Sequence, residues 1–253
     1  MNVYARLVYR NLRANLDRIT IFFELIFPLF FIFIQGFGLG GIIPNFEVGG
    51  VQLTYPQYLA AGAVTLTVIN SGTNAGTQLW FDRKNGMFEQ ILMGPFTRAQ
   101  YILSIILATM ILGLAASSIV FLIAFPIIGT SLSVTPFGAA LIFLSIFLGT
   151  VFFGTFAIAI SVVLRSSETF QIVSTFAFFI FLFVSTVFFP ADKAPMAIRT
   201  ASYLNPLTYS TDVFRAGLFS ALTPFNVLEV GVLAVEAAAM FAVAVFAFRR
   251  IKV

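Results

Sequence analysis

Long stretches without a charged residue alternate with short charged segments along this chain. A helix needs about 20 apolar residues to cross a hydrocarbon core roughly 30 Å thick, so each stretch can hold at least one membrane span. The longest, 99–164, can hold two, because Gly, Ser, Thr and Pro residues at 129–136 interrupt it. The pattern predicts an all-α integral membrane protein with six spans, at 19–40, 57–79, 99–128, 137–164, 169–189 and 227–248.

Three further segments are too short or too polar to be spans. Residues 1–18 place arginines on one side of a helix and apolar residues on the other, which predicts an interfacial helix; an ordinary charged flank is the alternative. In 83–95, apolar residues at i, i+1, i+4 and i+5 predict a short amphipathic helix that ends at Gly94-Pro95. Residues 190–226 contain two short helical stretches separated by Asn205-Pro206, which predicts a re-entrant helical hairpin on the outer face.

Composition supports the membrane assignment. The chain has 253 residues, of which 60% are hydrophobic and 9% charged, and its mean hydropathy is +1.01. Soluble domains carry about 25% charged residues, so a soluble globule is excluded. The absence of Cys and His excludes disulfides, thiol nucleophiles and metal sites built on those residues. No Walker A motif occurs, so the chain has no P-loop with which to bind ATP.

Basic residues predict the orientation. Most of the 14 Lys and Arg residues fall in alternate segments: before the first span, in the 80–98 loop, at 165–168 and in the tail. The loops 41–56 and 129–136 contain none. By the positive-inside rule, we expect a multi-pass protein of the cell (inner, cytoplasmic) membrane with both termini in the cytoplasm.

Several polar residues occur inside predicted spans. Gly72 and Gly76 allow another helix to approach the second span closely, and the polar residues there and in the fifth span line either a path or a subunit interface. Acidic residues are costly in a membrane, so Glu24 and Glu236 need a reason; Glu236 is either a proton relay or a structural hydrogen-bonding group. The candidate lining residues are Asn70, Ser71, Asn74, Thr175 and Ser185.

Two blocks of sequence resemble one family, the ABC-2 type permeases of ATP-binding-cassette exporters. The first runs from Arg83 through Leu92 to Gly94-Pro95, although Met93-Gly94 stands where the family commonly has a Thr-Pro pair. The second is Asn205-Pro206-Leu207-Thr208-Tyr209, followed by Asp212 and Arg215. The order and spacing of the blocks extend the resemblance over nearly the whole chain, 1–253, as a single transmembrane domain.

The resemblance implies a permease that docks on a separate ABC ATP-binding subunit, which holds ATP and Mg²⁺, and that pairs with a second permease copy, identical or a close paralogue. It implies export of a hydrophobic or amphipathic substrate such as a drug-like molecule, a lipid or a lipid-linked glycan. No catalytic, metal or cofactor residue is expected in this chain, and no nucleic-acid partner. The segment 83–95 corresponds to the coupling helix, with Arg83, Met87, Phe88, Glu89, Leu92 and Pro95 as candidate contacts, and the outer segment supplies a candidate gate from Asn205, Pro206, Tyr209 and Arg215.

Two other functional classes remain open on the sequence. An ion-coupled secondary transporter would use Glu236 and would favour inverted repeats, which are not visible here. A lipid-modifying membrane enzyme is the weakest alternative, because Asp192 and Asp212 stand twenty residues apart without a partner motif.

Overall fold

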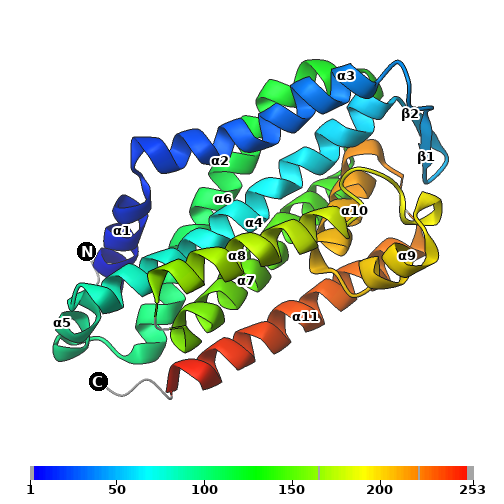
Figure 1. Ribbon diagram of the computed structural model, residues 1–253. Coiled ribbons are helices and arrows are strands. Elements are labelled where there is room, and N and C mark those ends of the chain that lie inside the picture. The colour runs from blue at the N-terminus through cyan, green and yellow to red at the C-terminus, as the bar shows by residue number, and fades with distance from the viewer. Residues whose placement is uncertain (1–2, 165, 222, 250–253) are drawn as a thin grey trace.

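The computed structural model describes residues 3–164, 166–221 and 223–249, and its long helices lie side by side in one bundle (Figure 1). Long apolar segments form helices because a helix satisfies its own backbone hydrogen bonds away from water. The helices are α1 (Val3–Asn15), α2 (Arg18–Phe30), a π-helical turn (Phe31–Gly36), α3 (Phe37–Leu39), α4 (Tyr55–Lys84), α5 (Met87–Met93), α6 (Arg98–Ile128), α7 (Pro136–Val163), α8 (Ser167–Phe183), α9 (Met196–Ser202), α10 (Pro206–Phe219) and α11 (Pro224–Arg249).

The bundle has two distinct ends. The helices α1 and α5 and the C-terminal part of α11 lie at one end, which we call the α5 end (Figure 1). The strands, α3 and α9 lie at the opposite end, which we call the hairpin end (Figure 1). Of the cations predicted to face the cytoplasm, Arg165, Arg250 and Lys252 fall outside the described residues.

Four segments are long and apolar enough to span a membrane: Arg18–Leu39, Arg98–Ile128, Pro136–Val163 and Phe225–Phe248. The fold is therefore consistent with an all-α membrane protein, and these four candidate segments correspond to the predicted spans 19–40, 99–128, 137–164 and 227–248. The other two predicted spans, 57–79 and 169–189, correspond to α4 and α8. The former is 30 residues long but less apolar than the four, and the latter is apolar but has 17 residues.

Helix boundaries follow local chemistry that the sequence displays. Thr97 accepts a hydrogen bond from the backbone N–H of Gln100 at 3.2 Å, and the Gln100 side chain accepts one from the Thr97 N–H at 2.9 Å, a capping box that starts α6. The Asp17 side chain caps α2 by accepting hydrogen bonds from the backbone N–H groups of Ile19 and Thr20, and hydrogen bonds from Thr20 lower the pKa of this exposed carboxyl. These caps satisfy backbone donors that have no partner inside the helix.

A small β-hairpin at the hairpin end was not predicted. Strand β1 (Phe46–Val48) pairs antiparallel with β2 (Val51–Leu53), and Gly49 and Gly50 connect them with φ of 54° and 85°. Two-residue hairpin turns favour such positive φ values, which glycine adopts at little cost. The Gly-Gly pair between two short β-prone runs was the available sequence signal.

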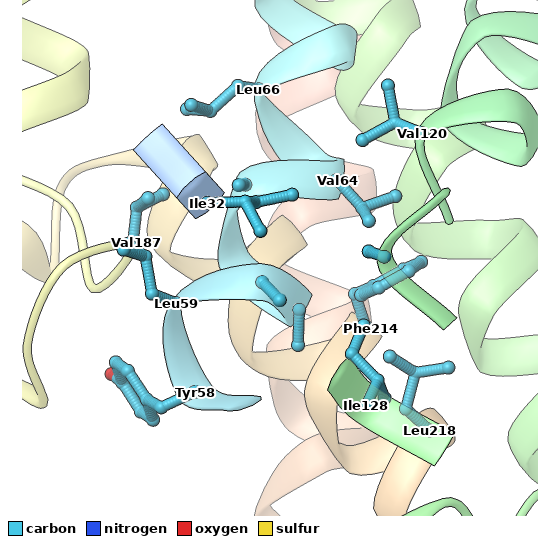
Figure 2. Close-up of a cluster of buried hydrophobic side chains, with 14 of the residues drawn as sticks. Ile32, Tyr58, Leu59, Val64, Leu66, Val120, Ile128, Val187, Phe214 and Leu218 are labelled. Atoms are coloured by element: carbon cyan, nitrogen blue, oxygen red, sulfur yellow. The ribbon is translucent and has the colours of Figure 1, made fainter. Parts of the chain in front are cut away.

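Helix α4 forms the centre of the bundle and packs mainly against α6 and α7. An added Cβ at Gly72 would lie 2.8 Å from the Gly154 nitrogen, and one at Gly76 would lie 2.5 Å from the Ala157 carbonyl oxygen. The predicted close helix approach at these glycines is thus confirmed, and α7 is the partner. Toward the hairpin end, the core gathers side chains from α4, α6 and α10, including Leu59, Val64, Val120 and Phe214 (Figure 2).

Candidate functional site

A cleft of about 430 Å³, lined by apolar side chains with several polar ones among them, lies between α2, α4 and α8, and we call it the three-helix cleft. Each helix turns one face toward it, since residues three or four positions apart share a side of a helix. On α8 this face comprises Gln171, Ser174, Thr175 and Phe178, at i, i+3, i+4 and i+7. The lining residues are Ile19, Thr20, Phe23, Glu24 and Phe27 from α2, Asn70, Thr73 and Asn74 from α4, and these four together with Phe179 from α8.

Glu24 is the acidic residue of the three-helix cleft. Its side chain is 8% exposed, and its Oε1 accepts a hydrogen bond from the hydroxyl of Ser71. This contact joins α2 to α4 across 47 residues of sequence. A buried carboxylate is stable only with hydrogen-bonding partners, and the polar face of α4 provides one of these partners for Glu24.

Ser174 lies on the α8 side of the cleft and is 9% exposed. Its hydroxyl oxygen is buried and has no hydrogen-bond partner within the described part of the chain. By contrast, Thr73, on α4, donates its hydroxyl to the Ile69 carbonyl at 2.9 Å. A buried hydroxyl without a partner costs about 1–3 kcal/mol, so Ser174 has hydrogen-bonding capacity that a bound molecule could use.

The structure brings together most of the polar residues that the sequence singled out. Asn70, Asn74, Thr175 and Glu24 line the three-helix cleft, and Ser71 reaches it through its bond to Glu24. Ser185 does not lie there: it is buried and donates to the Leu182 carbonyl at 2.7 Å. The candidate list from the sequence left out four polar lining residues, Thr20, Thr73, Gln171 and Ser174, although Gln171 and Ser174 share a helical face with Thr175.

Glu236 lies on α11, away from the three-helix cleft. Its carboxyl group is partly buried, and its Oε2 lacks a hydrogen-bond partner among the residues that the structure covers. No group of three or more acidic residues that could hold a metal ion occurs within residues 3–164, 166–221 and 223–249.

At the α5 end, the short helix α5 is anchored by one aromatic side chain. Phe88 is fully buried, and its ring centroid lies 5.4 Å from that of Tyr101 on α6 and 5.4 Å from that of Phe248 on α11. Met87 and Met93 are exposed, at 39% and 80%, and Pro95 is exposed as well. The outer surface of α5 therefore includes Met87, Gln90 and Met93 but not Phe88. Glu89 and Leu92 are partly buried.

Polar contacts near the α5 end tie α4 to α7 and α1 to α4. Arg83, at the end of α4, donates to the Ser161 carbonyl of α7 at 2.6 Å. Arg10 of α1 forms an ion pair with Asp82, which also accepts a 2.7 Å hydrogen bond from the Tyr101 hydroxyl. The hydrogen bond to Asp82 raises the pKa of Arg10. Arg10 therefore pairs with another helix of the protein, although the interfacial-helix prediction placed it with the other arginines of 1–18 on the polar side of the helix.

At the hairpin end, Arg215 forms a buried latch. Its side chain is 1% exposed and donates to the carbonyls of Tyr58 (3.0 Å from Nη2), Thr186 (2.8 Å from Nη1) and Val187 (2.8 Å from Nη2). Its guanidinium carbon lies 3.6 Å from the centroid of the Tyr58 ring. Figure 2 shows Tyr58 and Leu59 on α4 next to Val187. The latch joins α10 to α4 and to the segment that follows α8.

Two more features complete the latch. Asp212 accepts a 2.7 Å hydrogen bond from the Thr186 hydroxyl and lies 3.5 Å from Arg215 Nη1, so the buried charge is partly paired. Gly62 leaves room for the guanidinium, because an added Cβ there would collide with Arg215 Nη2 and lie 2.8 Å from the Val187 oxygen.

The other predicted gate residues also have structural partners. Asn205 caps α10 by accepting from the Leu207 N–H at 3.0 Å, and its side-chain amide donates to the Phe181 carbonyl at 2.7 Å. Pro206 is the first residue of α10, where its missing N–H is not needed. The Tyr209 hydroxyl donates to the Tyr203 carbonyl at 2.6 Å. This block therefore fixes the break between α9 and α10.

Comparison with known proteins gives consistent matches. The family model for the ABC-2 type transporter matches residues 4–219. "Putative transport permease ycf38" of Cyanophora paradoxa is 25% identical over 67% of this chain, and "Nodulation protein J" of Rhizobium leguminosarum bv. viciae is 25% identical over 88%. The match spans 58% of the former protein and 84% of the latter, and 61% of the Porphyra purpurea ycf38 protein. The chain thus covers less than two thirds of the two ycf38 relatives.

Proposed function

The chain belongs to the ABC-2 type transporter family, and on that premise we propose that it is the membrane permease subunit of an ATP-driven exporter. A separate ABC ATP-binding subunit holds ATP and Mg²⁺ and supplies the energy, because the chain has no P-loop. The observation that carries the proposal is the family match over residues 4–219, which includes every long helix except α11. The same match does not favour the ion-coupled alternative based on Glu236.

The proposed topology has six spans in the cell membrane with both termini in the cytoplasm. Helices α4 and α8 are the two additional spans. The polar face of α4 supports this, because it turns toward the three-helix cleft and so accounts for the low hydropathy of the helix. The irregular residues after Phe183 lengthen the path of α8 toward the hairpin end. Helices α9 and α10 form the re-entrant hairpin on the outer side.

The α5 end is the proposed docking side for the ATP-binding subunit. Met87, Met93 and Pro95 are exposed there together with the polar Gln90, and the partly buried Arg83 and Glu89 belong to the same segment. Phe88 and Leu92 connect this surface to the bundle, since Phe88 packs against both α6 and α11. A displacement of α5 is therefore transmitted directly to the long helices α6 and α11.

A second permease copy completes the proposed path. The exposed phenylalanines outside the three-helix cleft, among them Phe22 at 57% and Phe176 at 68%, supply apolar surface on α2 and α8 for a partner helix. Hydrophobic or amphipathic substrates leave past a cavity of about 280 Å³ at the hairpin end, which Asp212 and Arg215 border.

The test is reconstitution with the candidate ATP-binding subunit. We expect the two proteins to co-purify, and proteoliposomes that contain both to transport an amphipathic substrate only with hydrolysable ATP. Met93→Asp should weaken assembly, because it places a charge on the exposed face of α5. Met196→Asp is the matched control: Met196 is similarly exposed, at 84%, but lies at the hairpin end. Equal effects of the two substitutions, or transport without ATP, would refute the proposal.

A further inference from the structure

The three-helix cleft lies in the half of the bundle nearest the α5 end. With a rise of 1.5 Å per residue, Glu24 is about 9 Å from the start of α2, and Gln171 is about 6 Å from the start of α8. Asn74 is about 15 Å from the end of α4 by the same measure. All three helix ends lie at the α5 end (Figure 1). In the proposed topology, a molecule therefore enters the cleft from the cytoplasmic leaflet.

The charge of the three-helix cleft is one-sided. Glu24 is the ionisable residue among its lining residues, and within the described chain no Lys or Arg lines it. The Ser71 hydroxyl is a neutral donor and leaves the charge of the carboxylate uncompensated. An unpaired charge in a low-dielectric site is costly, so a cation that enters the cleft gains a favourable ion pair.

The three-helix cleft also offers hydrogen-bond acceptors to a ligand. Ser174 carries a buried hydroxyl oxygen without a partner in the part of the chain that is described. This oxygen has lone pairs that can accept a hydrogen bond from a ligand. The Asn70 and Asn74 amides on the opposite side offer carbonyl oxygens. A ligand with several N–H groups fits this arrangement.

Aromatic side chains border the polar centre on two helices. Phe23 and Phe27 come from α2, and Phe178 and Phe179 come from α8. The rings of Phe27 and Phe178 meet edge to face at 5.3 Å between centroids. Such rings bind flat apolar groups and attract cations to their faces.

We propose that the three-helix cleft binds an amphipathic organic cation, with its N–H groups on Glu24 and Ser174 and its apolar part against the four phenylalanines. This inference rests on the proposed export function only for its direction of entry and release. Recognition itself needs no ATP, so binding can be measured on the purified chain alone.

The experiment measures fluorescence anisotropy of two probes with the full chain in lipid nanodiscs, against empty nanodiscs. Rhodamine 6G is a flat amphipathic cation with N–H groups, and Nile red is a flat uncharged dye. We expect saturable binding of rhodamine 6G and weaker binding of Nile red. Glu24→Gln should lower the affinity for rhodamine 6G by about tenfold or more, because it removes a desolvated charge partner. The same substitution should change the affinity for Nile red by less than about threefold.

Glu236→Gln is the matched control, since it removes a carboxylate on a membrane helix outside the cleft and should leave both affinities unchanged. Asn74→Lys is a second variant that introduces a competing cation without altering Glu24, and it should also abolish rhodamine 6G binding. Monodisperse elution and the melting temperature of each variant show that it is folded.

Three results would overturn the inference: no saturable rhodamine 6G binding to the wild-type chain, equal losses with Glu24→Gln and Glu236→Gln, or equal losses of both dyes with Glu24→Gln. Failure of the exporter proposal has a different signature. In that case rhodamine 6G binds through Glu24, but ATP and the ATP-binding subunit produce no transport.

Discussion

The latch at the hairpin end and the three-helix cleft both place an ionisable side chain among membrane helices, yet they treat it differently. Arg215 donates to carbonyls of Tyr58, Thr186 and Val187 and is 1% exposed. Glu24 is buried to a similar degree but faces a cleft of about 430 Å³ where Ser174 lacks a partner. A saturated charge stabilises the fold, whereas an unsaturated one keeps capacity for a ligand. The two regions should therefore respond in opposite ways to substitution.

The largest effect should come from the latch. Arg215→Met removes the donors to three carbonyls and leaves Asp212 without its cation, and breaking such a buried arrangement costs about 3–5 kcal/mol. Thermal unfolding in detergent, followed by circular dichroism, should show a large decrease in melting temperature. An unchanged melting temperature would mean that the buried guanidinium does not stabilise this end.

A smaller loss is expected at the glycine that accommodates the latch. Gly62→Ala forces a Cβ against the Arg215 guanidinium and the Val187 carbonyl, and overpacking of this kind costs about 1–3 kcal/mol. Gly231→Ala on α11 is the control, because nothing lies within 4 Å of an added Cβ there. Alanine is the better helix former, so the control should be neutral or slightly stabilising by the same melting assay.

The smallest effect on stability should come from the cleft. Ser174→Ala removes a buried hydroxyl that bonds to no described residue, so stability should stay within about 0.5 kcal/mol of the wild type or rise. Rhodamine 6G affinity should fall severalfold in the same variant. If Ser174→Ala lowered the stability and left the dye affinity unchanged, the cleft would stabilise the fold as the latch does, and the proposed difference between the two regions would be wrong.

The sequence predicted the elements better than their contacts. Hydropathy located the long helices, and the Thr97 and Gln100 pair marked the start of α6. The apolar spacing around Phe88 correctly predicted α5, but periodicity does not distinguish a face that packs on the same chain from one that packs on a partner. Arg215 bonds to a carbonyl 157 residues away, and no local pattern encodes such a pairing.

For the candidate site too, the sequence indicated the residues but not their contacts. The polar residues of α4 stood out because they are unusual in a membrane helix, and Asn70 and Asn74 do face the three-helix cleft. That Ser71 meets Glu24 depends on how α2 crosses α4, which tertiary packing decides. Ser174 needed the burial of its hydroxyl to stand out, since serines in membrane helices commonly bond to their own backbone.

The attachment of α1 also has a consequence for the order of synthesis. Asn11 is fully buried: its side-chain oxygen accepts a hydrogen bond from Gln78, and its side-chain amide donates one to Ser104. The ribosome adds these two partners 67 and 93 residues later. The ion pair of Arg10 likewise forms only after Asp82 has been synthesised. Helix α1 therefore completes these contacts only after the start of α6, which carries Ser104, has been synthesised.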